Sequence, residues 1–216
     1  MNAPGTALVL FARAPELGRV KTRLALDVGA ARALEIYREL AEGVIGAVRG
    51  SATRMIVRFT PANAADEMHR WLGDGLAYEP QCDGDLGARM HDAIEVELAA
   101  GAERVIVIGT DCPTVTADTI AQALAALDEC DVVFGPAEDG GYYLVGTRAT
   151  APGLFHDMPW SSEQVLPLSL ERAAASGLRV SLLARMRDVD TGADWAAHEA
   201  RRAREAADQS RSPSGQ

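Results

Sequence analysis

The chain has 216 residues, of which 48% are hydrophobic and 24% charged, a composition typical of a soluble globular protein with one domain. It lacks an apolar stretch long enough to cross a bilayer and a leader for secretion, and its three cysteines form no Cys-x-x-Cys pair, so we expect a cytoplasmic protein. The net charge of −10 argues against nucleic acid as a partner, because phosphate backbones are bound by basic surfaces. The sequence indicates no particular oligomeric state.

Hydrophobic periodicity predicts strands that alternate with helices. In chain order, we expect a strand over residues 6–12, a helix over 28–48, a strand over 54–59, a helix over 61–71, a strand over 76–79, a helix over 85–100, a strand over 104–108, a helix over 116–127, strands over 131–134 and 142–146, a helix over 161–175, a strand over 178–183 and a helix over 192–207. This alternation is typical of an α/β sandwich of three layers, with a mainly parallel mixed sheet between helices. We expect one domain over residues 1–208 and a disordered polar tail over 209–216.

The charge is unevenly distributed along the chain. Residues 1–60 contain nine of the 21 lysines and arginines but five of the 31 acidic residues. An arginine-rich first part and an acidic remainder suit an anionic ligand that is held partly through a divalent cation. Solvated surface charge explains the same distribution equally well, so the choice between the two explanations depends on the individual motifs.

The loop after the first predicted strand is rich in cations. Four cationic side chains lie within residues 13–23, enough to surround a diphosphate, and the single lysine of the chain is one of them. We expect nucleotide or phosphate binding from Phe11, Ala12, Arg13, Gly18, Lys21, Thr22 and Arg23. The alternative is a solvated basic loop, and the spacing does not match a Walker A motif. The position of the loop favours binding, because ligands of α/β sheets lie beyond the carboxyl ends of the strands.

Asp111 follows the strand over residues 104–108, where a carboxylate has no packing role and needs a partner. Mg²⁺ and Mn²⁺ prefer oxygen ligands, and magnesium sites often use one or two carboxylates together with substrate phosphates. The alternative is that Asp111 caps the next helix, but Thr114 and Thr116 lie nearer to its start. We expect a metal ligand here, and Asp190, which follows the last predicted strand, as a second one.

A third loop contains acidic residues beside paired glycines. Asp139 or Glu138 is suited to accept hydroxyl hydrogen bonds or a proton, Gly140 and Gly141 leave space for a ligand, and Tyr142 is suited to cover a sugar. A hairpin turn explains the glycines equally well, but not the acidic residues. Two further segments add candidates: Gln81, Asp85 and Arg89 for the nucleotide, with helix capping as the alternative for Asp85, and Trp160 for the acceptor, with core packing as the alternative.

Four motifs, in this order, resemble the selenodomain-associated transferase family: FARAPELGRVKTRL at residues 11–24, GDLGARM at 84–90, IGTDCP at 108–113 and GPAEDGGYYL at 135–144. That family is similar to the glycosyltransferases of arsenosugar biosynthesis. The resemblance covers about residues 7–195 and implies the GT-A fold of the nucleotide-diphospho-sugar transferase superfamily.

The metal motif departs from the usual GT-A pattern. A typical enzyme of that fold has Asp-x-Asp, whereas Asp111 is followed by Cys112 and Pro113. The single carboxylate is similar to the guanylyltransferases of molybdenum-cofactor and coenzyme F420 synthesis, in which the second metal carboxylate comes from near the chain end, and Asp190 is the matching position. Those enzymes open with a Gly-x-Gly-x-Arg loop, whereas residues 12–18 contain one glycine.

These observations together predict an enzyme. We expect a transferase that uses Mg²⁺ or Mn²⁺ to move a sugar from a nucleotide-diphosphate donor to a small-molecule acceptor, with Lys21, Asp111 and Asp139 at its catalytic centre. One alternative is a nucleotidyltransferase that joins a nucleoside monophosphate to a phosphorylated metabolite and releases pyrophosphate. Another is a nucleotide-binding module without catalysis.

Overall fold

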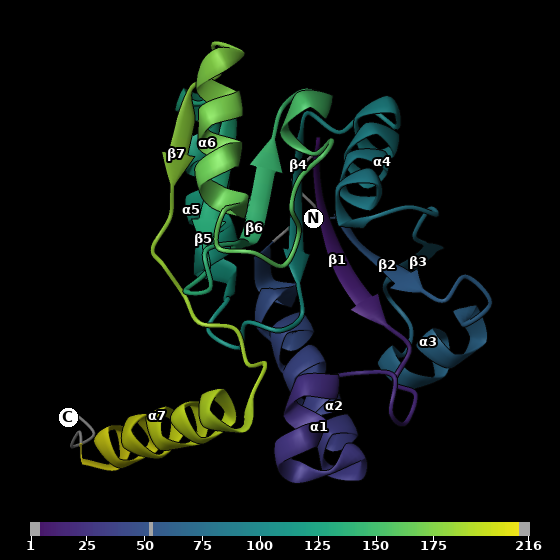
Figure 1. The fold of residues 1–216 in the computed structure, drawn as a ribbon, viewed down its shortest axis with the longest axis vertical. Coiled ribbons are helices and arrows are strands. Elements are labelled where there is room, and N and C mark those ends of the chain that lie inside the picture. Colours follow the sequence, from purple (N-terminus) through teal and green to yellow (C-terminus); the bar gives the residue numbers. More distant parts are fainter. Residues whose placement is uncertain (1–4, 52–53, 212–216) are drawn as a thin grey trace, which may run out of the picture.

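The computed structural model describes residues 5–51 and 54–211, which fold around a sheet of seven strands (Figure 1). The strands are β1 (Thr6–Arg13), β2 (Arg54–Thr60), β3 (Ala77–Pro80), β4 (Arg104–Gly109), β5 (Val132–Pro136), β6 (Tyr142–Thr147) and β7 (Val180–Leu182). Their order across the sheet is β3-β2-β1-β4-β6-β5-β7, and of these strands β6 runs antiparallel to both neighbours. The mainly parallel mixed sheet is therefore confirmed.

Helices cover both faces of this sheet. They are α1 (Thr22–Val28), α2 (Ala30–Val48), α3 (Ala65–Leu72), α4 (Leu86–Ala99), α5 (Ala117–Glu129), α6 (Val165–Ala175) and α7 (Gly192–Arg211), with short 3₁₀ turns η1 (Arg49–Ser51) and η2 (Pro152–Leu154). Side chains of α2, α3 and α5 share one buried cluster with the sheet, and those of α4 and α6 share another. The three-layer α/β/α arrangement is confirmed.

Strand β1 shows why the sheet is buried on both sides. Leu8 and Leu10 belong to the cluster under α2, and Ala7 and Val9 belong to the cluster under α4; all four are fully buried. A strand between two helical layers has to be apolar at successive positions, because its side chains alternate between the faces.

Two element boundaries differ from the prediction at the start of the chain. Residues 22–28 form α1, where we expected the end of a loop, and Gly29 separates α1 from α2 with a φ of 82°. This short helix buries Leu24 only, so it has little periodic signal. Pro61 was expected in a first helical turn, but α3 begins at Ala65.

Two more boundaries differ in the second half. Helix α6 begins at Val165 rather than at residue 161, because Ser161 has a φ of 63° that no helix accepts. Helix α7 continues to Arg211 and so includes residues 209–211 of the expected tail, whereas residues 212–216 lie outside the described part.

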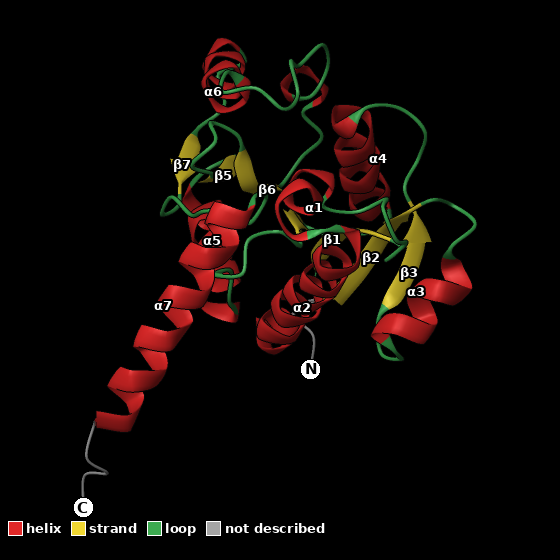
Figure 2. Cartoon of the chain, turned by 60° about the horizontal axis from the view of Figure 1, so that its bottom comes forward, coloured by secondary structure: helices red, strands yellow, loops and turns green. Residues whose placement is uncertain are grey.

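Helix α7 lies apart from the two main layers, and Figure 2 shows it extending away from the sheet. Its first turns are held by Trp195, which packs in a separate cluster with Leu24 of α1, Ile36 of α2 and Val189. The described residues contain no helix with the length and apolar character required to cross a bilayer.

Candidate active site

The carboxyl ends of the parallel strands meet at one edge of the sheet, near α1 (Figure 1). The loops after β1 and β4 and the turn between β5 and β6 therefore lie together, as expected for a binding site in a sheet of this kind. A further stretch, residues 183–191 after β7, runs along the same edge. It is attached to β5 through the bond from the Met186 amide to the Pro136 carbonyl (3.0 Å), and to the loop after β4 through the bond from the Val189 amide to the Asp111 carbonyl (2.9 Å).

The loop after β1 is fixed by Tyr37 on α2. The Tyr37 hydroxyl accepts a hydrogen bond from the Arg13 amide and donates one to the Arg13 carbonyl, each at 2.8 Å. The Arg13 guanidinium in turn donates to the carbonyl of Arg19 (3.1 Å). Sequence reasoning placed Tyr37 in the helix pattern alone and missed this role, because the two residues are 24 positions apart.

Lys21 brings together the two carboxylates that the sequence predicted as metal ligands. Its Nζ lies 2.6 Å from Oδ1 of Asp111 and 3.0 Å from Oδ1 of Asp190, and its side chain is only 6% exposed. Arg23 adds a longer contact to Asp190 (3.4 Å) from a side chain that is mostly exposed. Burial by itself lowers the pKa of Lys21, but the two carboxylates outweigh it and raise the pKa above its ordinary value.

Asp188 is a third carboxylate at this point, which sequence reasoning did not single out. Its side chain is half-buried, and the buried Oδ1 has no hydrogen-bond partner among the described residues. Burial, together with the charges of Asp111, Asp139 and Asp190, raises its pKa to about 7. The available signal was the alternation of Asp188 and Asp190 with the apolar Val189; in the structure Val189 is buried and both aspartates line one cavity.

The turn between β5 and β6 contributes Asp139 and the two glycines. Oδ1 of Asp139 accepts a hydrogen bond from the Gly141 amide (2.9 Å). Gly140 has a φ of 89°, and a Cβ there would come within 2.5 Å of the backbone of Glu163, so this turn needs glycine. Glu138 lies apart from the others, because its carboxylate pairs with Arg187 (2.6 Å) on the outer side of the turn.

Gln81 follows β3 and Arg89 lies on α4, and Gln81 contacts both Arg89 and the end of β2. The Gln81 side chain donates to the carbonyl of Arg58 (2.9 Å), and Arg89 approaches its amide oxygen at 3.5 Å. Asp85 accepts a hydrogen bond from the Ala88 amide (2.8 Å) as the cap of α4, which is the alternative the sequence left open. Thr116 caps α5 in the same way, so Asp111 is not required as a cap.

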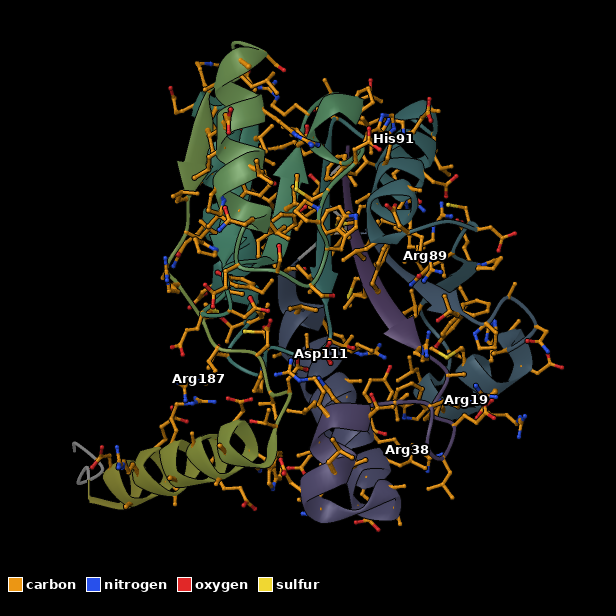
Figure 3. All side chains as sticks on the ribbon, in the orientation of Figure 1. Arg19, Arg38, Arg89, His91, Asp111 and Arg187 are labelled. Carbon is orange, nitrogen blue, oxygen red and sulfur yellow. The ribbon has the colours of Figure 1, made fainter. Side chains whose placement is uncertain are left out.

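Two cavities meet at this edge. One, of about 390 Å³, is lined by Arg13, Arg19, Lys21, Arg23 and Arg89, and we call it the basic cavity. The other, of about 360 Å³, is lined by Asp111, Asp139, Asp188 and Asp190, and we call it the acidic cavity. Phe11, Leu86, Asp111 and Asp190 line both. In Figure 3, Asp111 lies at the lower end of the sheet, with Arg89 and Arg19 on one side of it.

The remaining walls of the acidic cavity are mainly apolar. Tyr142 and Trp160 line it together with Met90, Leu144 and Val165. Of the residues that the structure describes, none of those lining it is lysine, arginine or histidine. Cys112 also lines it, but burial raises the pKa of its thiol to about 12, so it is not a thiolate nucleophile.

Of the residues predicted to bind the nucleotide, Phe11, Ala12, Arg13, Lys21, Thr22, Arg23, Gln81 and Arg89 line the basic cavity, whereas Gly18 and Asp85 do not. Of those predicted for the sugar or acceptor, Gly141, Tyr142 and Trp160 line the acidic cavity, whereas Glu138 and Gly140 do not.

The donor set suits a divalent cation of the magnesium type. Asp111 and Asp190 converge on the position of one positive charge, and further ligands for a cation there would come from phosphates and water. Over residues 5–51 and 54–211 no group of three or more His, Cys, Asp or Glu side chains has the arrangement of a metal site.

Comparison with known proteins gives a family, a relative and solved structures. The family model described as "uncharacterized protein conserved in bacteria (DUF2064)" matches residues 45–162, more than half of the chain. A phosphoenolpyruvate guanylyltransferase from Chloroflexus aggregans is 32% identical over 147 residues, which cover 65% of this chain and 69% of that protein.

A crystal structure from Desulfovibrio desulfuricans G20, described as a candidate nucleotide-diphospho-sugar transferase, is 30% identical with a TM-score of 0.84, covering 88% of this chain and 84% of the other. Rv0371C from Mycobacterium tuberculosis, solved in complex with manganese, has a TM-score of 0.58 at 17% identity, with 91% and 98% covered, which shows a shared fold alone. The chain therefore has the fold of nucleotidyltransferases and nucleotide-diphospho-sugar transferases, and the GT-A-like fold that the sequence predicted is confirmed.

Proposed function

The chain belongs to the DUF2064 family of bacterial proteins, and we propose that it is a glycosyltransferase that takes a sugar from a nucleotide-diphosphate donor. The observation that carries this proposal is the separation of charge between the two cavities. Arginines and Lys21 line one cavity, aspartates line the other, and the two meet at Asp111 and Asp190.

The basic cavity suits the diphosphate of the donor. Arg13, Arg23 and Arg89 present planar guanidinium groups that bind phosphate oxygens in pairs, and Lys21 adds a compact charge. Tyr37 holds the backbone of Arg13 in place, so the loop is ordered before a ligand arrives.

The acidic cavity suits a sugar. Carboxylates accept hydrogen bonds from hydroxyl groups, and the rings of Tyr142 and Trp160 offer apolar surface for the faces of a pyranose. Lys21 is paired with Asp111 and Asp190, so a phosphate or carboxylate group in the same place would be opposed by the two remaining aspartates, Asp139 and Asp188. This favours transfer of an uncharged sugar over transfer to a phosphorylated acceptor.

Asp111 and Asp190 would hold a Mg²⁺ or Mn²⁺ ion together with the donor phosphates. When bound, such an ion neutralises the negative charge that develops on a departing diphosphate. In the reaction we propose, the bond between C1 of the sugar and the diphosphate oxygen breaks, and C1 forms a bond with a hydroxyl oxygen of the acceptor. The nucleoside diphosphate leaves, and the hydroxyl proton passes to Asp139. The amide of Gly141 holds one oxygen of that carboxylate, and the proposed proton acceptor is the other.

A second candidate is the nucleotidyltransferase reaction, favoured by the 32% identity to a phosphoenolpyruvate guanylyltransferase. In that case a nucleoside triphosphate would occupy the basic cavity, and a phosphate group of the acceptor would attack its α-phosphorus. The product besides the joined molecule would be pyrophosphate rather than a nucleoside diphosphate.

A ligand panel followed by product analysis separates the two. Thermal unfolding is measured with UDP-, GDP-, ADP- and TDP-sugars and with the triphosphates, each with and without Mn²⁺. A ligand at 100 times its dissociation constant stabilises the folded state by about 2.7 kcal/mol, a readily measured shift. The proposal expects stabilisation by a nucleotide sugar with Mn²⁺ and release of the nucleoside diphosphate. Stabilisation by triphosphates alone, with pyrophosphate released when phosphoenolpyruvate is added, would establish the second candidate instead.

A further inference from the structure

The ammonium group of Lys21 occupies the point at which Asp111 and Asp190 converge. It lies 2.6 Å from one carboxylate and 3.0 Å from the other, and its side chain is 6% exposed. No other lysine occurs in the chain, and the nearest arginine contact, from Arg23 to Asp190, is longer and mostly exposed. These two carboxylates are also the pair suited to a divalent cation.

An ammonium and a divalent cation cannot share this position. A cation bound by the two Oδ1 atoms that Lys21 contacts would lie 2.0–2.6 Å from them, as Mg²⁺ and Ca²⁺ do from their oxygen ligands in proteins. Lys21 Nζ already lies within about 3 Å of the same oxygens, so the two positive charges would be in contact and repel each other. One of the two therefore has to leave when the other binds.

The Lys21 side chain has a second position available, in the basic cavity. It also lines that cavity, beside Arg13 and Arg23, and its flexible four-carbon stem allows the ammonium to turn. In that cavity the donor phosphates would replace the two carboxylates as its partners.

We propose that Lys21 fills the cation position in the free protein and competes with the divalent cation for Asp111 and Asp190. This rests on the proposed function in that the donor diphosphate is what draws Lys21 away. The free protein then binds a divalent cation weakly, and donor and cation favour each other's binding. Lys21 thus acts as an internal substitute for the metal, which keeps the two carboxylates together until the donor arrives.

Binding of Mn²⁺ without any nucleotide tests the competition directly. Isothermal titration is run on the wild type, on Lys21→Met and on Arg23→Met, the last removing an equal charge beside the same carboxylate. The proposal expects Lys21→Met to bind Mn²⁺ at least tenfold more tightly than the wild type. It expects Arg23→Met to show a smaller increase in Mn²⁺ affinity. Adding Asp111→Asn to Lys21→Met should remove the gain. Equal or weaker binding by Lys21→Met, or no binding by any variant, would overturn the proposal.

Thermal unfolding covers the case in which Lys21→Met is unstable, since two carboxylates then face each other without an ammonium. The proposal expects its midpoint to lie below that of the wild type in EDTA and to rise with Mn²⁺ by more than the wild-type midpoint does. If the variant refolds from denaturant with Mn²⁺ but not in EDTA, the ion has replaced the ammonium. Failure to refold with Mn²⁺ would count against the proposal. Neither measurement uses a sugar donor. Both can therefore support the competition between Lys21 and the cation even if the proposed glycosyl transfer is not observed.

Discussion

The hydroxyl group of Tyr37 makes two hydrogen bonds to the main chain of Arg13, accepting from its amide and donating to its carbonyl at 2.8 Å each. A helix residue thus replaces a sheet partner at the end of β1, where the chain turns into the basic cavity. Burial of Tyr37 raises the pKa of its hydroxyl above the ordinary value, so the group keeps the proton that it donates.

Tyr37→Phe removes both bonds and leaves the Arg13 amide and carbonyl to find other partners. We expect the free energy of unfolding to fall by about 1–3 kcal/mol, the usual result when a buried polar group loses its partner. Donor affinity should fall as well, because Arg13 lines the basic cavity. Urea denaturation and titration calorimetry measure the two effects. Tyr78→Phe is the control, since its hydroxyl donates to the Gly73 carbonyl (2.6 Å) and lines neither cavity; an equal loss of donor affinity in this variant would contradict the assignment.

Gly87 on α4 supports the segment that closes the acidic cavity. A Cβ at this position would lie 2.2 Å from the carbonyl oxygen of Phe155 and 2.8 Å from the ring of Trp160. Gly87→Ala should therefore displace Trp160, destabilise the protein by about 1–3 kcal/mol and weaken sugar binding. Gly153→Ala, with no atom within 4 Å of its Cβ, should change stability by no more than about 0.5 kcal/mol. Denaturation of the two variants under the same conditions measures their free energies of unfolding. Similar values for both would argue against close packing at Gly87.

Asp188 makes stability depend on pH in a defined direction. Its pKa is raised from 3.8 to about 7 in the folded protein, first by burial and then by the neighbouring aspartates. Between these two values the folded state holds a proton that the unfolded state has lost, so the free energy of unfolding falls as the pH rises through this interval. The contribution is complete below about pH 4 and lost above about pH 7.

The variant that tests this pH dependence is Asp188→Asn. Its free energy of unfolding is measured in EDTA so that no cation interferes. At pH 4 it should resemble the wild type, and at pH 8 it should be more stable by a few kcal/mol, the order expected from a shift of this size. Asp74→Asn, on an exposed residue outside both cavities, should keep the wild-type slope. A wild-type stability that is flat between pH 4 and pH 8 would show that Asp188 is not buried with its neighbours as described.

The acidic cavity should discriminate against negative charge on the sugar. UDP-glucose and UDP-glucuronate form one matched pair, and GDP-mannose and GDP-mannuronate another. For whichever base binds, we expect the uronate to bind roughly tenfold or more weakly, because like charges in contact are costly. Asp139→Asn removes one of the opposing charges and should reduce the difference in affinity between the uncharged sugar donor and its uronate. Equal affinities within a pair would remove the argument for an uncharged sugar.

The sequence predicted most of the fold because the sheet is regular. Buried strands such as β1 and β4 are continuous apolar runs, and α2 and α5 have clear periodic faces. Helix α1 was missed because it has seven residues and buries only Leu24. The start of α6 was misplaced because the positive φ of Ser161 depends on tertiary contacts that residue type does not reveal.

The candidate site was predictable as a set of loops but not as a set of contacts. Lys21 and Asp190 are 169 positions apart, and no local pattern states that their side chains touch. Asp139 and Glu138 are adjacent and both acidic, yet one lines the acidic cavity and the other pairs with Arg187. Successive residues in a turn face different sides, and only the three-dimensional structure separates them.

The stretch over residues 183–191 also has a consequence for synthesis on the ribosome. A growing polypeptide that has reached β6 already contains the arginines of the first loop and Asp111, but neither Asp188 nor Asp190. Until β7 and the residues after it emerge, Lys21 has one of its two carboxylate partners and the cation pair is incomplete. Under the proposed function, the site is therefore complete only after residues 188–190 have been synthesised, close to the end of the chain.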